Sequence, residues 1–517
     1  MMTTSELAKA VEQALEYLRS TGQVAEAEVF ASSNASLLAR LNYTSHIPCN
    51  GVEEPKSTES SGLGIQAVFR TDEGIKIGFG SEPSDLSLDG VRRALEKAKR
   101  GAVADPEFSS LPRPTGERRR LRRHHDPKLM KIRDDELVEA GWKLLRGGLH
   151  TFMASPRLIE LAGGQERVND LGLILGGDVT ILQERIAIAS SALPEVQTDE
   201  STLIMSFITA MVEAEASKGT GCSTGTRLEG FTDEAGVEAA RNAIAAIGGE
   251  RIKSGEYTVI LGRQPVADLL NNLILPSLSL SAFYSDSSTF IGKLGKRVAS
   301  RQFTLYDQGA QRGLMGSKGI TCEGLPTGKT RLIQRGKLVG LLSNHYEQQR
   351  ILKDPKSQEK LGADPGLNMK GIVPRNGFRF GAGGGRQFSV QPGIAATNAI
   401  VEGGDHSPEE LIATVKDGLL IGRIWYTYPI NGLRAGDFTC TVVGDSYIIR
   451  DGRIAAPLKP NTVRISGNIH NILSNIVGIG KDVKGTLVWA ADEVIHTPQI
   501  AVRGVKIDEI AGFMEQL

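Results

Sequence analysis

Short apolar runs separated by glycine and proline turns fill the second half of this 517-residue chain, which contains 60 glycines and 21 prolines. Two stretches place a charged residue and a glycine between strand-like runs, at Arg335–Gly336 and at Asp451–Gly452. This pattern is typical of a β-hairpin. A run of helical periodicity interrupts the strands and predicts a helix over residues 408–421. From about residue 251 onward, the sequence therefore predicts a β-rich unit with a large, barrel-like or strongly coiled sheet.

The first half of the chain is predicted to form α/β units. Leu7, Val11 and Leu18 share one face of a helix expected over residues 5–19, and strand-like runs follow it. A polar connection over residues 101–127 precedes further helices and strands. We therefore predict an α+β fold, in which N-terminal α/β units with mixed sheets precede the β-rich unit. The predicted domains are residues 1–105, 126–248 and 251–517.

The charge balance argues against nucleic acid as a partner. Lysine plus arginine and aspartate plus glutamate each number 60, whereas nucleic-acid-binding proteins usually carry a basic excess. The chain contains no apolar run of 18 residues, so no membrane-spanning segment is predicted. The four cysteines are far apart, and the first residues contain no apolar core of a signal peptide. We therefore expect a reduced, cytoplasmic chain.

Two unusual stretches each admit a structural and a functional interpretation. The basic run RRRLRRHH at residues 118–125 fits a solvated face or linker, or alternatively a site for an anionic partner. The glycine-rich run GAGGGR at residues 381–386 has no clear strand-to-helix setting for phosphate binding. It fits a flexible loop, or alternatively a loop that contacts a ligand.

The order of motifs in the second half of the chain carries a family resemblance. In chain order these motifs are SGEYTVILG, STFIGKLGKRVAS, CEGLPTGKTRLIQRGKLVGLL, ATNAIVEGGDHSPEELIATVKDGLLI and NGLRAGDFTCTVVGDSYIIRDGRIAAPLKPNTVRISGN. Together they resemble the TldD/PmbA family, also called modulator-of-gyrase proteins. The N-terminal half matches more loosely, through GLGIQAVFR and HDP.

The resemblance implies a two-subunit peptidase in which one type of subunit binds zinc. In the TldD-like subunit, a His-Glu-x-x-x-His segment supplies two zinc ligands and a general base, and a cysteine near the C-terminus is the third ligand. The two histidines are five residues apart, so a regular helix does not align them and a local bulge is needed.

This chain departs from the zinc-binding pattern. Asn271, Asn272 and Pro276 stand at the positions of the first histidine, the glutamate and the second histidine. Near the expected cysteine the sequence is VKGTLVWAADEV, which contains Trp489. Because these residues ligate zinc poorly, the departure points to the PmbA/TldE-like branch, which lacks the HExxxH motif. We therefore expect this chain to bind no cofactor, and we expect zinc in a partner subunit.

The matching motifs also give candidates for substrate binding. Asp437 of the Gly-Asp-Phe motif fits a turn-stabilising role as well. Cys322, which has no histidine near it in sequence, fits a packed side chain better than a nucleophile. The substrate-binding candidates are Glu323, His345, Thr397, Asn398 and Asp437.

Three functional hypotheses remain open from the sequence. The leading one is a zinc-less subunit that pairs with a TldD-like zinc metallopeptidase subunit, or with itself as a dimer. It would help to enclose a cavity for peptides or unfolded proteins and bind their backbone as an added strand. The second is a metal-independent enzyme that tailors a peptide or secondary metabolite, and the third is a non-catalytic, peptide-binding homodimer. Candidate residues for the second are Asn271, Asn272, Cys322, Glu323 and His345.

Overall fold

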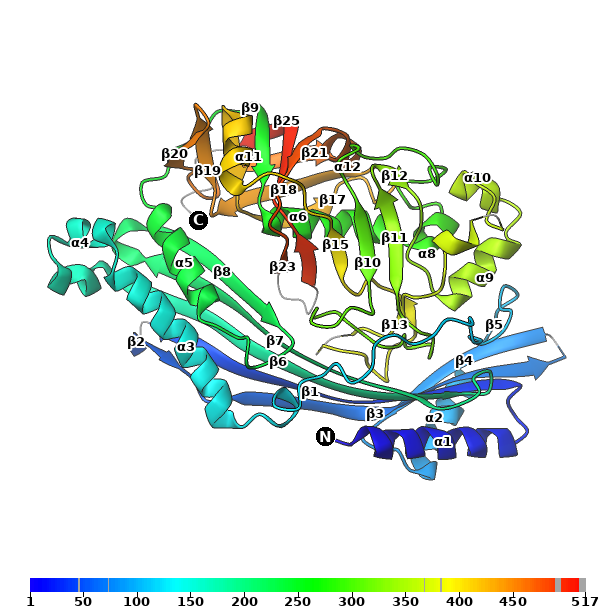
Figure 1. Cartoon of the computed structure of the whole chain (residues 1–517). Helices are drawn as coiled ribbons and strands as arrows, with labels where there is room; N and C mark the ends of the chain where they lie inside the picture. The colour runs from blue at the N-terminus through cyan, green and yellow to red at the C-terminus, as the bar shows by residue number, and fades with distance from the viewer. Residues whose placement is uncertain (45–46, 73, 367, 382–383, 489–493, 511–517) are drawn as a thin grey trace.

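The computed structural model describes residues 1–44, 47–72, 74–366, 368–381, 384–488 and 494–510 (Figure 1). A long sheet from the N-terminal half runs along one side of the molecule, and the C-terminal half lies across one of its faces (Figure 1). Within the described ranges, no helix combines the length and the apolar character needed to cross a membrane.

The N-terminal half forms one antiparallel sheet. Its strands are β1 (Glu26–Thr44), β2 (Ile47–Val52), β3 (Lys56–Thr71), β4 (Gly74–Pro83), β5 (Val103–Ala104), β6 (Leu173–Ser190), β7 (Gln197–Val212) and β8 (Ser217–Gly225). They follow the order β5-β4-β3-β1-β6-β7-β8, with β2 paired to β1. Because β1 pairs with β3 on one side and with β6 on the other, residues 1–105 and 126–248 share this sheet.

The pairing within this sheet differs from the mixed sheets that we predicted for the N-terminal units. Every described pair is antiparallel. The reason lies in the connections, because β3–β4, β6–β7 and β7–β8 are neighbours in sequence that are joined by only a few residues. Parallel strands need a crossover of a dozen residues or more, which these connections are too short to provide.

The two faces of the sheet are covered by different parts of the chain. The helices of this half are α1 (Thr4–Ser20), α2 (Leu88–Arg100), α3 (Asp134–Met153), α4 (Pro156–Ala162) and α5 (Glu234–Ala245). Along β1, Val29 and Ala31 pack in a core with α1 and α2, whereas Phe30 between them packs against the C-terminal half. Residues alternate between the faces of a strand, so this pattern places helices on one face and the C-terminal half on the other. Helix α1 confirms the helix predicted over residues 5–19.

Three further sheets form the C-terminal half. The nine-stranded sheet contains β9 (Gly255–Leu261), β16 (Gly418–Ile421), β17 (Arg423–Pro429), β18 (Asp437–Gly444), β19 (Tyr447–Arg450), β20 (Arg453–Pro457), β21 (Val463–Asn468), β22 (Ile476–Ile479) and β25 (Ile500–Glu509). The six-stranded sheet contains β10 (Leu305–Gln308), β11 (Lys329–Gln334), β12 (Lys337–Leu338), β15 (Ala399–Val401), β23 (Lys484–Leu487) and β24 (Val494–Thr497). The third consists of β13 (Gly377–Phe378) and β14 (Gly393–Ile394).

Helices lie between these strands and complete the C-terminal half. They are α6 (Arg263–Leu269), α7 (Leu275–Ser277), α8 (Leu280–Tyr284), α9 (His345–Lys353), α10 (Ser357–Leu361), α11 (Pro408–Val415) and α12 (Ile469–Ser474). The two larger sheets of this half are mixed, because β9 pairs with β16 and β15 with β24 in parallel. The predicted α+β class, with a strongly curled, β-rich C-terminal half, is confirmed.

Both predicted hairpins of the C-terminal half are confirmed. The first joins β11 to β12 and the second joins β19 to β20. Arg335 and Gly336 have φ values of 46° and 77°, and Asp451 and Gly452 have φ values of 51° and 70°. Positive φ at both central residues is the geometry of the tight turn that matches the twist of antiparallel strands.

The helix predicted over residues 408–421 is wrong in its second half. Helix α11 ends at Val415, and Lys416 has a φ of 60°, which turns the chain out of the helix. Gly418–Ile421 then form β16. The apolar run in this segment also fits a helical pattern, but it pairs with β9 in the core. A short apolar run fits a buried strand as well as a helix, and tertiary pairing decided the outcome here.

Close packing of α2 on β4 gives a first testable prediction. A Cβ at Gly80 would lie 2.1 Å from the carbonyl oxygen of Ala94, so Gly80→Ala must push the helix away from the strand. We expect a loss of about 1–3 kcal/mol in the free energy of unfolding, measured by urea titration. Gly444→Ala is the matched control, because nothing lies within 4 Å of the added atom. Equal stabilities of the two variants would contradict this packing.

Candidate functional site

A cavity of about 1140 Å³ lies between the inner face of the N-terminal sheet and the C-terminal half. Its volume exceeds the roughly 300–1,000 Å³ that is common for small-molecule pockets. Leu182 and Leu203 of the sheet form what we call its floor, and segments of the C-terminal half form its walls. Its polar lining includes Ser279, Ser281, Ser285 and Ser287, and its charged lining is Lys318, Glu347 and Arg350.

A single π-helical turn shapes one wall of the cavity. This turn (Leu270–Ile274) follows α6 and continues into α7. A π turn is wider than an α turn, so it brings residues five apart onto one face. Asn271 and Pro276, which are five apart, both line the cavity. This is the local bulge that the spacing of the His-Glu-x-x-x-His motif requires.

The residues at the three motif positions do not fit a zinc ion. Asn271 offers only a neutral amide and Pro276 offers no side-chain donor atom. Asn272 does not line the cavity, and its Nδ2 donates to Oδ1 of Asp268 at 3.2 Å. Trp489 lies outside the described residues. Among the residues that the structure does describe, no three His, Cys, Asp or Glu side chains form a group that could hold a metal ion.

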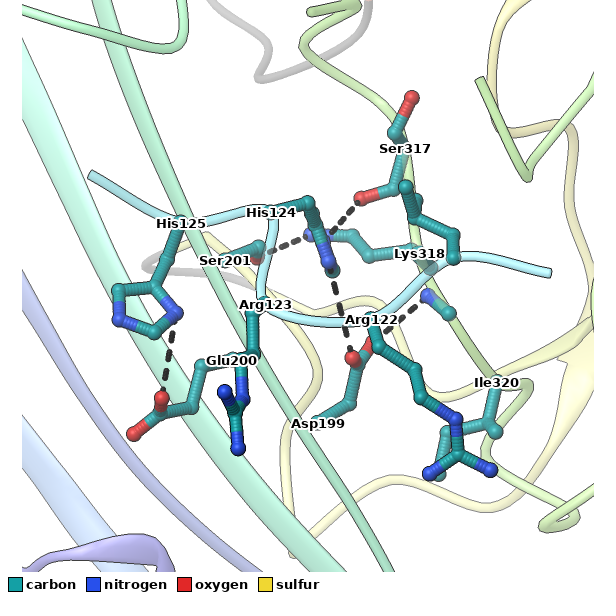
Figure 2. A network of polar contacts seen from close by, with 12 residues as sticks. Arg122, Arg123, His124, His125, Asp199, Glu200, Ser201, Ser317, Lys318 and Ile320 are labelled. Atoms are coloured by element: carbon teal, nitrogen blue, oxygen red, sulfur yellow. Dashed lines mark hydrogen bonds and ion pairs between the residues drawn. The ribbon is translucent and has the colours of Figure 1, made fainter. Parts of the chain in front are cut away.

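A buried ion network lies at the cavity floor, and Figure 2 shows the part of it around Asp199, Ser201 and Lys318. The Glu184 carboxylate of β6 accepts hydrogen bonds from Nε and Nη2 of Arg386 at 2.9 and 2.6 Å, and from Nζ of Lys318 at 2.9 Å. Although burial acts to raise it, Arg386 and Lys318 hold the pKa of Glu184 well below its ordinary value. Ser201 of β7 donates to Glu184 at 2.6 Å. It also accepts from Lys318 at 2.8 Å, as Figure 2 shows.

Part of the basic run at residues 118–125 enters this network. Asp199 is contacted by Nη2 of Arg119 at 2.5 Å and by Nη1 of Arg386 at 3.1 Å. His124 Nε2 lies 3.1 Å from the carbonyl oxygen of Ser317, and burial lowers the pKa of His124 to about 4 (Figure 2). Because the imidazole is then neutral near pH 7, this nitrogen carries the proton and donates. The other arginines of the run are exposed, so the run is partly solvated and partly bound to carboxylates of its own chain.

A second buried arginine fixes the same segment to the sheet. Arg379 is fully buried, and its Nη2 donates to Glu28 of β1 at 2.7 Å. Its Nη1 donates to the carbonyl oxygen of Val390 at 2.6 Å. Burial raises the pKa of Glu28, although Arg379 opposes this effect. The chain between Arg379 and Arg386 is therefore held to the sheet at both ends.

The glycine-rich run lies between these two arginines. Gly381, Gly384 and Gly385 line the cavity, whereas residues 382 and 383 lie outside the described residues. Gly385 has a φ of 70°, and a Cβ there would lie 2.9 Å from Oε2 of Glu184. Glycine thus allows the backbone to approach the carboxylate closely. This position favours the interpretation of the run as a loop that contacts a ligand.

Arg350 of α9 lines the cavity and makes several contacts in its wall. Its Nη1 donates to Glu347 at 2.9 Å, its Nε donates to Glu107 at 2.9 Å, and its guanidinium lies 3.7 Å from the centre of the Tyr284 ring. The Tyr284 hydroxyl donates to Glu107. Burial raises the pKa of Glu347. These contacts tie the connection after β5 to the cavity wall.

Glu323 and His345 lie together, but neither lines the cavity. Both carboxylate oxygens of Glu323 are 3.2 Å from the backbone nitrogen of His345, the first residue of α9. A carboxyl group at this place caps the start of the helix. Burial raises the pKa of Glu323 to about 8 and lowers the pKa of His345. Their role in substrate binding stays a prediction.

The other three substrate-binding candidates divide between the cavity and the turns around it. Thr397 lines the cavity, and its backbone nitrogen donates to Asp307 at 2.8 Å. Asn398 does not line it; its Oδ1 accepts from the backbone nitrogen of Gly316 at 2.9 Å, which shapes the wall. Asp437, at the start of β18, accepts from Nδ2 of Asn468 at 2.8 Å and does not line the cavity.

Cys322, a candidate residue for a metal-independent enzyme, is fully buried and does not line the cavity. Burial raises the pKa of its thiol to about 12.

Sequence reasoning missed most of the charged residues at the cavity. Neither Lys318 nor Glu184 is a candidate from the sequence, and Arg386 enters only as the last residue of the glycine-rich run. One signal was present, because Glu184 stands in the apolar strand run ILQERIAIAS, where a charged residue must find a partner.

Comparison with known proteins agrees with this architecture. Residues 254–509 match the PmbA/TldA metallopeptidase C-terminal domain. A metalloprotease from Methanothermobacter thermautotrophicus is 23% identical over 288 residues, which are 54% of this chain and 57% of that protein. A metalloprotease TldD homolog from Buchnera aphidicola subsp. Acyrthosiphon pisum is 27% identical over 251 residues, 48% of this chain and 45% of that protein. The chain thus matches about half the length of these relatives.

Solved structures resemble the chain over nearly its whole length. TldE from Thermococcus kodakarensis has a TM-score of 0.72 and 20% identity, and the match covers 96% of this chain and 100% of that one. A modulator of DNA gyrase from Bacteroides thetaiotaomicron has a TM-score of 0.71 and 16% identity, covering 99% and 100%. At these identities the likeness establishes the fold.

The raised pKa of Glu323 gives a second prediction. Between about pH 4.5 and pH 8 the unfolded state releases the proton of this carboxyl while the folded state keeps it. This group's stabilising contribution is complete below about pH 4.5 and declines as pH rises to about 8, at most by about 1.4 kcal/mol per pH unit. Glu323→Gln should remove this decline, as measured by urea unfolding at pH 5, 6, 7 and 8.

The exposed residue Glu54 provides the control for that series. Glu54→Gln should keep the pH dependence of the wild type. If Glu323→Gln also kept it, the carboxyl of Glu323 would not be held protonated in the folded protein.

Proposed function

Because this chain belongs to the TldD/PmbA family, we propose that it is a PmbA/TldE-like, zinc-less subunit of a TldD/TldE-type metallopeptidase system. One observation carries the proposal. The π turn brings Asn271 and Pro276 to the cavity wall at the positions of two zinc-ligating histidines, where neither side chain fits the metal. In this proposal the chain has the bulge that the zinc motif requires without its ligands, and the metal chemistry belongs to a partner.

The cavity is the proposed place for the substrate, a peptide or a segment of an unfolded protein. Its volume of about 1140 Å³ and its mixture of apolar, serine and backbone surfaces support this role. The glycines at 381, 384 and 385 expose backbone groups, which can bind an extended chain without selecting its side chains. Thr397 and the lining serines (Ser279, Ser281, Ser285 and Ser287) add hydroxyl donors.

The proposed partner is a TldD-like zinc metallopeptidase subunit or a second copy of this chain. In a TldD-like partner, zinc would supply an activated water. This chain binds and orients the peptide and shields it from bulk water. Exposed apolar side chains gather on and beside the edge strand β17, at Trp425, Tyr426, Tyr428 and Ile430, and they support an association with another chain.

A metal-independent enzyme has less support. Cys322, Glu323 and His345 do not line the cavity. The raised pKa of the Cys322 thiol also opposes formation of a thiolate nucleophile.

Co-expression with a TldD-like partner tests the proposal. We expect the two chains to co-elute in size-exclusion chromatography and to hydrolyse an unfolded protein substrate together. Removal of zinc with a chelator should abolish hydrolysis, because hydrolysis by the complex depends on the partner's zinc. Separate elution and the absence of hydrolysis by the mixture would contradict the proposal.

A pair of tryptophan variants tests whether this chain's cavity takes part. Ser285 lines the cavity and is exposed there, whereas Ser20 is exposed at the end of α1. Ser285→Trp should slow hydrolysis by the complex while co-elution persists, and Ser20→Trp should leave both unchanged. Equal rates for the two variants would place the substrate elsewhere.

A further inference from the structure

The buried network at the cavity floor contains more cations than anions. Its cations are Arg119, Lys318 and Arg386, and its anions are Glu184 and Asp199. At most a tenth of each of these side chains is exposed. The described part of the network therefore carries one positive charge in excess in a region largely shielded from water.

The other groups around His124 form no described ion pair with the cations of this network. The buried carboxylate of Asp126 accepts instead from the backbone nitrogens of Lys128 and Leu228. His124 itself is neutral near pH 7, because burial lowers its pKa to about 4. Arg122 and Arg123, which precede it, are exposed and positive. Glu200 is directed toward His125, whose Nδ1 lies 3.1 Å from its carboxylate (Figure 2).

The buried carboxyl of Asp307 is engaged in a different way. It accepts hydrogen bonds from Thr397 and from Nδ2 of Asn376, and the described residues show no ion pair to it. Burial raises its pKa, which favours the neutral form. Asp307 therefore does not serve as the counter-ion of the network.

Lys318 is the one cation of this network among the residues that line the cavity in the described part of the chain. Its ammonium group has three donors, of which Glu184 and Ser201 receive two. Leu182, Leu203 and Met315 also line the cavity, and apolar surroundings of this kind strengthen an ionic contact.

This lysine lines the cavity of about 1140 Å³, which is the space for a ligand. Gly384 and Gly385 line the cavity without side chains, and Gly385 lies against the same Glu184 carboxylate that Lys318 contacts. A buried charge without a counter-ion is costly, so an anion that enters here gains a strong partner.

We propose that Lys318 binds a carboxylate of the substrate. The group is either the C-terminal carboxylate of a peptide or the carboxylate of an acidic side chain, which share the same chemistry. The assignment rests on the proposed function, because it takes the occupant of the cavity to be a peptide. It adds that the cavity prefers substrates with a carboxylate at the floor and an apolar chain along Leu182 and Leu203.

Calorimetric titration of the full-length chain with three short peptides tests the proposal. The probes are acetyl-trileucine with a free carboxylate, the same peptide as its amide, and acetyl-Leu-Leu-Glu amide. The free acid should bind about 10- to 100-fold more tightly than trileucine amide, the range expected for a hydrogen bond to a charged group. Binding of the glutamate peptide as tightly as the free acid would support the acidic side chain as an equal source of the carboxylate.

Two substitutions assign the preference to a residue. Lys318→Met should abolish the difference between acid and amide, whereas Lys337→Met, at an exposed position, should preserve it. A preference that survives in Lys318→Met would overturn the assignment. If that variant does not fold, the wild-type comparison decides alone.

The outcomes separate this proposal from the one on which it rests. Equal binding of acid and amide to the wild type would overturn the lysine site and leave the peptide-binding role intact. If no peptide bound either to the chain alone or to its complex with a TldD-like partner, both proposals would fall.

Discussion

Two fully buried arginines hold the cavity together. Arg379 pairs with Glu28 and Arg386 pairs with Glu184, so a segment of the C-terminal half is fixed to the central strands of the N-terminal sheet. A buried ion pair is often no more stabilising than well-packed apolar residues, but removal of one partner costs about 3–5 kcal/mol. The pairs therefore act mainly by selecting one placement of the segment. That placement puts the glycine-rich run against the cavity, where its backbone is available to a ligand.

The π turn is the second constraint on the cavity. A π turn is rare compared with an α-helix and is found frequently at functional sites. Here it persists although the residues that it presents, Asn271 and Pro276, cannot ligate zinc. Under the proposed function, this wall shape would serve a cavity shared with a metal-bearing partner. The charged residues that line this cavity, Lys318, Glu347 and Arg350, are not part of the zinc pattern and suit the binding of a polar chain.

The sequence was informative where structure depends on neighbouring residues. The hairpins at Arg335–Gly336 and Asp451–Gly452 follow from residues that tolerate positive φ, and these residues adopt it. Helix α1 follows from its apolar periodicity. The sequence was misleading where distant pairing decides the outcome, as in the strand β16, whose apolar run also fits a helix.

The cavity could be predicted only in part. The spacing of the relatives' zinc motif requires a bulge, and a π turn lies at the matching positions of this chain. Of the three motif positions, Asn271 and Pro276 line the cavity and Asn272 does not. The network of Glu184, Lys318 and Arg386 joins residues 134 and 202 positions apart, and no local pattern encodes such contacts. Glu323 and His345 matched the motif order, but the fold uses their contact to begin α9.

Metal analysis of the purified full-length chain, by inductively coupled plasma mass spectrometry, tests the central claim most directly. Our account predicts far less than one zinc per isolated chain. It predicts bound zinc only in samples that also contain a TldD-like partner. One tightly held zinc per isolated chain, lost when Asn271 is replaced by alanine, would contradict it.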